Sequence, residues 1–430
     1  MAKSANKTSV WQSLRNIWKV EDIRKKLIYT FFMLVLFRLV GVIPAPGVDY
    51  AKVQAAMGGQ NLAILDLVNM MTGNNFSNMT IMAMGITPYI NSSIIMQLLT
   101  IAIPALEKLQ KSGPDGQKKI ARITRYVTVV LAIIQAIGLV SSLNYMKSGW
   151  FNYVLVGVSM AAGTALAMWI GERITEKGIG NGISLLIFAG IISNLFNGYS
   201  SMIKTAIHAT SLTPWIQLLG MIVLALVMIV VVTFVDSAVR RLTVVYAKRV
   251  VGNKMYGGQT QYLPIKLLSV GVLPLIFAYS FMAFPSTIIQ LVGGTSSSAY
   301  IWWQTYMNSY SPLYLIITAL LIIAFTYFYS AISFQANDIA ENIKNQGGTV
   351  DHIRPGAQTA QYINRINQRL TLFAALFLAV LATIPNLATR ALNSSVPFAA
   401  SSILIAVSVV LETKRQLDDM LVDRNYDSIF

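Results

Sequence analysis

Ten long apolar stretches, separated by polar and basic connections, constrain this chain more than any other feature. A helix needs about 20 apolar residues to cross a hydrocarbon core of about 30 Å, and most of these stretches have about that length. Only 12% of the residues are charged and 55% are hydrophobic, whereas about a quarter of a soluble chain is charged. Because lipid offers the backbone no hydrogen bonds, we expect an all-α integral membrane protein. The expected spans are residues 27–43, 80–102, 126–143, 152–171, 182–198, 215–235, 267–291, 311–333, 370–388 and 396–411.

Lys and Arg between the spans fall mainly on one side, which is the pattern of cytosolic connections. On that side are Lys3, Lys7, Arg15, Lys19, Arg24, Lys25, Lys26, Lys108, Lys111, Lys118, Lys119, Arg122, Arg125, Arg173, Lys177, Arg240, Arg241, Lys248, Arg249, Lys254, Lys266, Lys344, Arg354, Arg365, Arg369, Lys414, Arg415 and Arg424. The other side has only Lys52, Lys147, Lys204 and Arg390. We therefore expect both termini in the cytosol. Arg38 is left inside the first span near its outer end, where it can reach headgroups or loop carbonyls, so we expect a structural role for it.

Ten spans divide into two groups of five, residues 27–198 and 199–411. Because each group has an odd number of spans, the second group enters the membrane from the opposite side to the first. This is the topology of an inverted repeat, whose functional site lies between the two halves. Residues 1–26 are expected to form a cytosolic amphipathic segment at the membrane surface. Residues 412–430 are expected to be a cytosolic tail.

The second span contains residues that a lipid-facing helix would not favour, among them Gly85, Pro88 and Asn91. Ile86 and Ile90 are four residues apart and share one helical face. Both a pore lining and an ordinary helix core explain this stripe. The two longest cytosolic connections, 236–266 and 335–369, contain strand-like and turn-like pieces. They are expected to be docking surfaces, or a basic face that attracts anionic lipid.

Composition argues against an enzyme. The chain has no Cys and only two His, His208 and His352, and neither His lies in an apolar run. No nucleophile–base pair and no metal-ligand cluster can be assembled within the spans, so we expect no metal and no cofactor. An ion-coupled secondary transporter with inverted repeats is the alternative, although its coupling usually needs charged groups near the midplane.

Several motifs occur together and in a fixed order. They are GITPYINSSIIMQLLT, EKGIGNGISLLIFAGI, VVYAKRVVGNKMYGGQTQYLPIKLL, GVLPLIFAYS and HIRPGAQTAQYI. Over residues 23–419 the chain resembles the SecY family, the channel subunits of the bacterial Sec protein translocon.

The resemblance implies two five-helix halves around an hourglass pore that a ring of aliphatic side chains closes. That ring would consist of Ile86, Ile90, Ile183, Ile187, Ile276 and Ile405. Such a collar would exclude water by dewetting and make no specific bonds to a passing polypeptide.

The resemblance also implies a plug, a short helix at about residues 65–78 that fills the external funnel at rest. Its residues would include Asp66, Asn69, Met70 and Gly73. An external amphipathic loop would have the same sequence character. Asn91 and Gln135 match the family's lateral gate, through which signal sequences leave for the lipid, although structural packing explains each of them equally.

The cytosolic docking residues implied by the resemblance are Arg240, Arg241, Lys248, Arg249, Lys254, Arg354, Pro355 and Gly356. The implied partners are SecE, SecG, the SecA ATPase, the ribosome, unfolded preproteins with their signal sequences, and membrane lipid. No nucleic acid is expected except through the ribosome, and the implied location is the bacterial cytoplasmic membrane.

Two departures from the family pattern affect these expectations. The pair Asn253-Lys254 stands where adjacent basic residues are frequent, and this could weaken one contact with the motor or ribosome. Residues 398–402 read FAASS instead of the usual FGGTS, which changes the helix that precedes Ile405.

Overall fold

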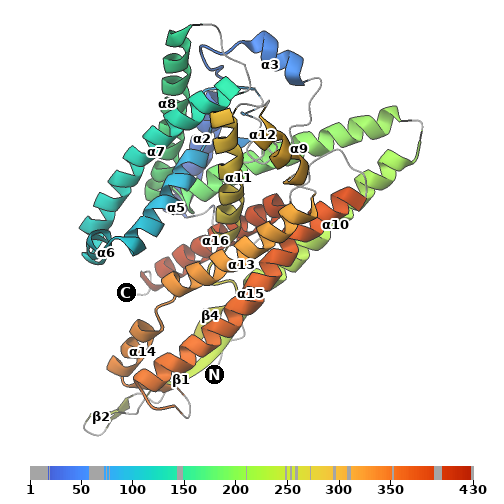
Figure 1. The fold of residues 1–430 in the computed structure, drawn as a ribbon. Helices are drawn as coiled ribbons and strands as arrows, with labels where there is room; N and C mark the ends of the chain where they lie inside the picture. The colour runs from blue at the N-terminus through green and yellow to red at the C-terminus, as the bar shows by residue number, and fades with distance from the viewer. Residues whose placement is uncertain are drawn as a thin grey trace. The chain divides into compact units, whose positions relative to one another are not determined.

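The computed structural model describes residues 18, 20–57, 72–73, 75–76, 78–142, 149–209, 211–246, 249–251, 254–256, 260–271, 273–293, 297–307, 311–350, 353–391 and 400–427. A helix lies at each of the ten expected spans (Figure 1). These helices are α2 (Glu21–Val40), α5 (Thr87–Ala102), α7 (Pro114–Ser142), α8 (Trp150–Lys177), α9 (Gly182–His208), α10 (Thr213–Ser237), α11 (Leu273–Gly293), α13 (Pro312–Ser333), α15 (Ala357–Ala391) and α16 (Ala400–Asp427).

The remaining described elements are short. The helices are α3 (Tyr50–Met57), α6 (Pro104–Lys111), α12 (Ser298–Tyr306) and α14 (Ala336–Asn345). The strands are β1 (Val239–Tyr246), β2 (Arg249–Val251), β3 (Lys254–Tyr256), β4 (Thr260–Lys266) and β5 (Gly348–Val350).

Within the described residues, six helices are long and apolar enough to cross a membrane alone, and the pair α5 and α6, bent by 102°, would make a seventh. The expectation of a helical membrane protein is confirmed. The number of crossings stays a prediction.

Helix limits differ from the expected spans in a systematic way. α7 begins at Pro114 and α15 at Ala357, about three turns before the apolar part of each helix. The helical hydrogen bonds continue through the polar residues that precede the apolar part. α5 instead starts late, at Thr87, because Met79 and Gly85 have positive φ angles of 45° and 51° that a helix cannot contain.

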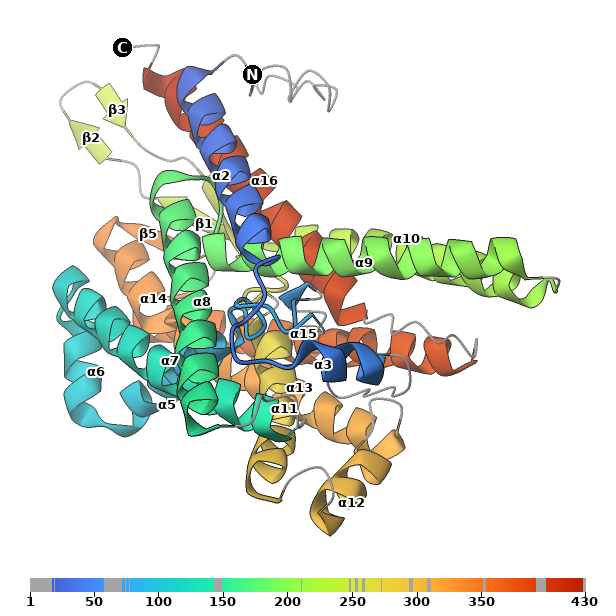
Figure 2. The ribbon, with the colours of Figure 1, turned by 90° about the horizontal axis from the view of Figure 1, so that it is seen from above.

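The chain forms two compact units. The first contains residues 1–210, 283–308 and 405–430, and the second contains residues 211–282 and 309–404. In the first unit α7 packs on α8 and α5, and α8 packs on α2 and α9. The beginning of α2 and the second half of α16 lie side by side (Figure 2). Ile23 and Ile179 are buried there, with Leu417 and Leu421 packed against them.

In the second unit α13 packs on α15. Their contact includes a buried polar group in which Asn367 Nδ2 donates to Ser330 Oγ at 3.0 Å, and Ser330 Oγ lies 2.7 Å from Thr371 Oγ1. An aromatic group joins α11 to α13, with the rings of Phe277 and Tyr329 stacked at 4.7 Å.

The two longest connections between the expected spans, 236–266 and 335–369, fold together into one small subdomain of the second unit. β1 pairs antiparallel with both β4 and β5, which gives the strand order β4-β1-β5. Leu242 and Val244 of β1 are buried with Val350 of β5, Ile343 of α14 and Ile363 of α15. The strand-like pieces expected in these connections are confirmed, and their pairing was not foreseen.

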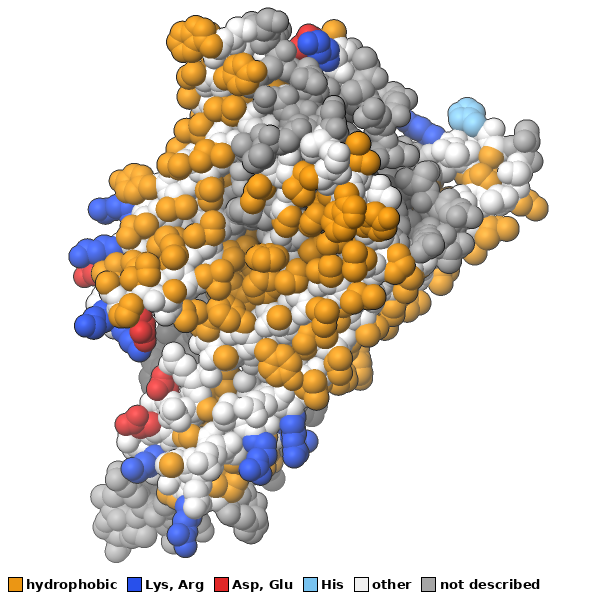
Figure 3. Space-filling view, viewed as in Figure 1, with side chains coloured by type: hydrophobic (Ala, Val, Ile, Leu, Met, Phe, Trp, Pro, Cys, Tyr) orange, Lys and Arg blue, Asp and Glu red, His pale blue; other side chains and the backbone are white. Residues whose placement is uncertain are grey.

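Apolar side chains cover the long helices, as Figure 3 shows for one face. On α10, Leu219, Val230 and Phe234 are 67%, 67% and 77% exposed. A soluble protein rarely exposes such a continuous apolar surface, whereas lipid covers it without cost. Lys and Arg gather beyond the apolar bands, near α6 and near the lower end of α15 in this view (Figure 3).

Candidate functional site

Ile86 and Ile90 lie at the beginning of α5. Ile86 is the residue that precedes the helix, and the amide of Ile90 donates to its carbonyl at 3.1 Å. Pro88 fits the first turn because that turn needs no amide donor. Each isoleucine is 6% exposed, so the structure buries the stripe that the sequence predicted.

Ile183 and Ile187 lie in the first two turns of α9. Asn181 caps this helix, and its Oδ1 accepts from the amides of Ile183 and Ser184. Ile187 is 4% exposed. Ile183 is partly buried, and a Cβ added to Gly171 of α8 would lie only 3.1 Å from its Cγ1. Part of the Ile183 side chain therefore packs on α8.

The other two candidate ring residues lie on α11 and α16. Ile276 belongs to the second unit and is 6% exposed. Ile405 belongs to the first unit and is 5% exposed. Leu404 before it is also buried, and the two residues after it are partly buried. Whether the six isoleucines meet at one constriction stays a prediction.

Of the candidate plug residues, Asp66, Asn69 and Met70 lie outside the described residues. Gly73 is described and buried, with φ of +68°. Its carbonyl accepts a hydrogen bond from Arg38 Nη1 at 3.1 Å, and Arg38 Nη2 donates to the carbonyl of Ala189 in α9 at 2.6 Å. The expectation that Arg38 can bond to loop carbonyls is confirmed.

A small anchor follows the plug region and was not predicted from the sequence. Thr80 forms an isolated antiparallel bridge with Pro44. Around this bridge Ala45 N donates to Met79 O at 3.1 Å and Ile81 N to Ile43 O at 2.9 Å. The Tyr50 hydroxyl donates to Ala45 O at 2.9 Å and to Met79 O at 3.0 Å. Burial raises the pKa of the Tyr50 phenol above its ordinary value of 10.0.

The candidate gate residues lie on helices that pack together. Asn91 of α5 is 6% exposed and Gln135 of α7 is 9% exposed. Their Oδ1 and Oε1 atoms are buried without a hydrogen-bond partner among the described residues, as is Thr87 Oγ1 one turn before Asn91. Unsatisfied buried polar atoms are uncommon and weaken the packing that surrounds them. All three residues lie on α5 and α7, two helices that pack on each other.

The candidate docking residues are distributed over the small subdomain. Arg240 and Arg241 of β1 are both exposed, and neighbouring strand residues point to opposite faces of a sheet. Lys248 lies outside the described residues, and for Arg249 and Lys254 only the backbone, in β2 and β3, is described.

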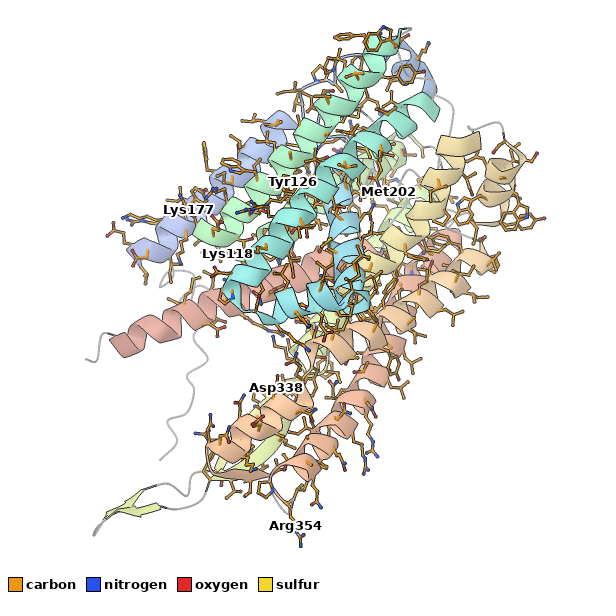
Figure 4. All side chains as sticks on the ribbon, turned by 60° about the vertical axis from the view of Figure 1, so that its left-hand side comes forward. Lys118, Tyr126, Lys177, Met202, Asp338 and Arg354 are labelled. Carbon is orange, nitrogen blue, oxygen red and sulfur yellow. The ribbon has the colours of Figure 1, made fainter. Side chains whose placement is uncertain are left out.

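Arg354 lies at the tip of the loop that leads into α15, and its side chain points away from the protein (Figure 4). Ile353 before it is partly buried against the subdomain core. Pro355 follows, then Gly356 with φ of +100°, a conformation that favours glycine. The Arg354 carbonyl accepts from Thr359 Oγ1 at 2.9 Å. The loop backbone is thus held at several points while the guanidinium is exposed.

The chain is similar to known proteins over most of its length. The SecY family model matches residues 80–414. The protein translocase subunit SecY of Streptomyces scabiei is 39% identical over 428 residues, covering 95% of this chain and 97% of that protein. The protein of the same name from Halalkalibacterium halodurans is 38% identical over 434 residues, covering 97% and 99%.

Solved structures share the fold at lower identity. A structure described as a protein conducting channel has a TM-score of 0.67 at 20% identity and covers 95% of this chain and 96% of its own. One of SecY, described by a plug domain that stabilises the closed state, has a TM-score of 0.66 at 20% identity over the same shares. Sec61 in a canine ribosome–channel complex has a TM-score of 0.65 at 20% identity, again over 95% and 96%. With relatives of nearly equal length and a family model that matches most of the sequence, this chain belongs to the SecY family.

Proposed function

We propose that this chain is a protein-conducting channel which passes unfolded preproteins across a bacterial cytoplasmic membrane and releases transmembrane segments sideways into the lipid. The observation that carries the proposal is the family, since bacterial relatives named as protein translocase subunits match 95% and 97% of the chain. Family membership also removes the secondary transporter as a candidate. The chain works as a conduit and not as an enzyme.

The proposed architecture has ten transmembrane helices in two inverted halves, residues 27–198 and 199–411, around an hourglass pore. Three observations support it. A helix lies at each expected span, the long helices expose apolar side chains, and Lys and Arg follow the charge pattern of cytosolic connections. In this topology residues 1–26 and 412–430 are both cytosolic.

The proposed pore ring consists of Ile86, Ile90, Ile183, Ile187, Ile276 and Ile405. Five of these side chains are 4% to 6% exposed, which suits a constriction without room for a column of water. Branched aliphatic side chains repel water and ions, yet they offer a translocating chain no hydrogen bonds that would hold it. The residue types therefore fit a passage for polypeptides of any sequence.

The proposed plug is the segment 65–78, and the proposed gate includes Asn91 and Gln135. Gly73, the plug glycine that the structure describes, accepts a hydrogen bond from Arg38 Nη1. Asn91 of α5 and Gln135 of α7 lie on the second and third spans, which would form one side of the gate, with the seventh and eighth spans on the other side. Polar contacts between membrane helices contribute only about 1 kcal/mol each, which suits repeated opening.

The proposed docking surface is the subdomain of β1, β4, β5, α14 and the beginning of α15. Its exposed Arg240, Arg241 and Arg354 suit acidic protein surfaces and ribosomal RNA. Similar channels are known in complexes with ribosomes. We assign this surface to the ribosome and to the SecA ATPase, while SecE and SecG join the chain within the membrane.

Reconstitution tests the function directly. The full chain is placed in lipid vesicles with SecE and SecG, and SecA, ATP and an unfolded preprotein are added outside. We expect the preprotein to become resistant to added protease only when ATP is present. The same preprotein with an internal cross-link that prevents unfolding is the control and should stay sensitive. An unfolded preprotein that stays fully sensitive with ATP would contradict the proposal.

A further inference from the structure

The connection between α11 and α13 has an unusual composition. No residue from Leu267 to Asn337 is charged, so the connection at 294–311 contains no Lys, Arg, Asp or Glu. Each of the other connections that the proposed topology places outside contains a basic residue, namely Lys52, Lys147, Lys204 or Arg390. The uncharged connection is instead rich in amphipathic rings, which belong to Tyr300, Trp302, Trp303, Tyr306 and Tyr310. A charged partner would find no group to pair with in this connection.

This connection contains α12, which has two different faces. Ser297 caps the helix, and its Oγ accepts from the amide of Tyr300 at 3.2 Å. Tyr300 and Met307 lie on one face and are 4% and 8% exposed. The opposite face, which we call the outward face, consists of Ile301, Trp302, Thr305 and Tyr306, and all of these side chains are exposed. α12 therefore packs on the protein through one face, while the other face is exposed.

The outward face is apolar and aromatic. Ile301, Trp302 and Tyr306 are 56%, 52% and 52% exposed, and the ring centres of Trp302 and Tyr306 lie 5.4 Å apart. Water solvates such side chains poorly, because most of their surface is apolar. Hydrocarbon does not suit the two rings either, because the indole N–H and the phenol O–H need hydrogen-bond partners. Trp and Tyr are enriched where lipid headgroups meet acyl chains, because both requirements are met there.

The chain on both sides of α12 keeps this helix close to the membrane. Residues 294–297 join it to α11, and residues 307–311 join it to α13. An extended chain spans at most about 3.6 Å per residue, so α12 lies within about 20 Å of the ends of both helices. Ile288 of α11, in the same unit as α12, is 51% exposed, and Leu313 and Ile316 of α13 are 41% and 58% exposed. The outward face thus continues, along the chain, the exposed apolar surface of the flanking helices.

We propose that α12 is an anchor in the outer membrane–water interface, with its outward face inserted between phospholipid headgroups and the beginnings of the acyl chains. An amphipathic helix in this position is buried by about 5–10 Å. Because the connection has no charge, the anchor recognises the polarity gradient of the bilayer and not the charge of its headgroups. The anchor fixes the depth of the outer end of α11. This inference does not depend on transport, and only the side on which α12 lies rests on the proposed topology.

Two other environments of the outward face make different predictions. If a soluble protein outside the cell covered this face, neither lipid nor water would reach it. If the face lay in bulk water, water-soluble molecules would reach it freely. The collision rates of a spin label with oxygen, which concentrates in lipid, and with a water-soluble nickel chelate distinguish the three cases. The chain has no cysteine of its own, so a label can be attached at one chosen position.

The first experiment leaves the aromatic residues unchanged. A nitroxide is attached to Thr305→Cys on the outward face, and the full chain is reconstituted with SecE and SecG in phosphatidylcholine vesicles. Leu226→Cys, near the middle of α10 and 57% exposed, is the reference for hydrocarbon. Glu341→Cys, exposed on α14, is the reference for water.

We expect the label at position 305 to collide with the nickel chelate several-fold less often than the label at position 341, and with oxygen more often. The label at position 226 should be the least accessible to the chelate. A label at position 305 that the chelate reaches as often as at position 341 would overturn the proposal. A label that neither oxygen nor the chelate reaches would indicate a covering protein and would overturn it as well.

The second experiment tests whether the rings hold the helix in place. The double variant Trp302→Gln with Tyr306→Gln removes both rings, and we expect the chelate to collide with the label at position 305 several-fold more often. The exchange variant Trp302→Tyr with Tyr306→Trp keeps one ring of each kind and should keep the original rates. Unchanged rates for the label at Leu226→Cys report that each variant stays folded. Equal rates at position 305 in the two folded variants would contradict the proposal, and the first experiment decides without removing any ring.

The charge of the lipid gives a further test. Replacing part of the phosphatidylcholine with anionic phosphatidylglycerol should leave the rates at position 305 unchanged, because the connection has no charge. A strong dependence on headgroup charge would overturn the proposed mode of recognition.

The side of the membrane is tested separately with Ser298→Cys, at the exposed start of α12. It should react with a thiol reagent that cannot cross membranes when the reagent is added outside intact cells. A reaction only in opened cells would refute both the topology and the outer position of α12. A reaction in intact cells, together with collision rates typical of water at position 305, would refute the anchor and leave the topology standing.

Discussion

At the scale of single residues, Tyr50 shows how one hydroxyl can secure a loop. It donates to Ala45 O and Met79 O, on both sides of the bridge between Pro44 and Thr80. We predict that Tyr50→Phe lowers the free energy of unfolding by about 1 kcal/mol. Thermal unfolding of the purified chain in detergent measures this, with Tyr262→Phe, which is 61% exposed on β4, as the control. Equal midpoints for the two variants would contradict the prediction.

The same tyrosine predicts a pH dependence. Burial raises the pKa of Tyr50 above its ordinary value of 10.0. A raised folded-state pKa contributes stability that is fully present below pH 10 and is lost as the pH rises through the folded pKa. The stability difference between the native chain and Tyr50→Phe should therefore shrink at strongly alkaline pH.

Some residue-level features could be read from the sequence because they are local. Ile86 and Ile90, or Ile183 and Ile187, share a face through helical geometry alone, and Asn181 is a typical helix cap. The partners of Arg38 could not be assigned, because Gly73 and Ala189 are 35 and 151 residues away in the chain. Only their meeting in space identifies Arg38 as more than a snorkelling residue.

At the scale of elements, a substitution in the loop before α15 tests whether this loop is part of the docking surface. Arg354 is exposed and points outward from a loop whose backbone is held by Thr359 and by the partly buried side chain of Ile353. We predict that Arg354→Glu abolishes ATP-driven preprotein transport in the reconstituted system while the chain still folds and inserts. The measurement is the amount of protease-protected preprotein, normalised to the amount of inserted channel.

The control for this prediction is Arg365→Glu, which changes the same charge at an exposed position of α15. A specific docking loop loses activity only with Arg354→Glu. A basic face that merely attracts anionic lipid loses the same amount with either variant. Equal activity of the two variants would refute docking through the loop.

The sequence predicted most of the long helices and strand β1, but it did not predict which of these elements pack or pair with each other. The spans were visible as apolar runs, and β1 was visible as a strand-like piece. The pairing of Val244 with Val350 joins two connections that are about a hundred residues apart, and three-residue strands such as β5 leave almost no pattern. The early start of α15 was missed because polar helical turns lack the hydropathy that marks a span.

At the scale of the whole molecule, the first test asks on which side of the membrane each connection lies. A reporter enzyme active only outside the cytosol should work when it is fused at Met307, after α12, and should fail when it is fused at Gly347, between α14 and β5. Both fusions lie outside helices and strands, so neither interrupts an element. The reverse pattern of activity would overturn the proposed topology.

The topology stays a prediction, and it rests on the charge pattern of the connections, because Lys and Arg are enriched on the cytosolic side of membrane proteins. The ring could be predicted only through resemblance to a family, since nothing local distinguishes a pore-lining isoleucine from a core isoleucine. Ile183 shows this ambiguity, because it is partly buried and packs on Gly171.

The most direct measurement is the ion conductance of planar bilayers that contain the resting channel with Asn in place of Ile90, Ile187 or Ile276. A closed ring predicts that each substitution brings water into the constriction and raises the resting conductance, while Leu at the same position keeps it closed. Ordinary core residues would instead lose stability, by about 1–3 kcal/mol for a buried unsatisfied amide, and the folded fraction would not conduct. Three well-folded Asn variants without any leak would contradict the account.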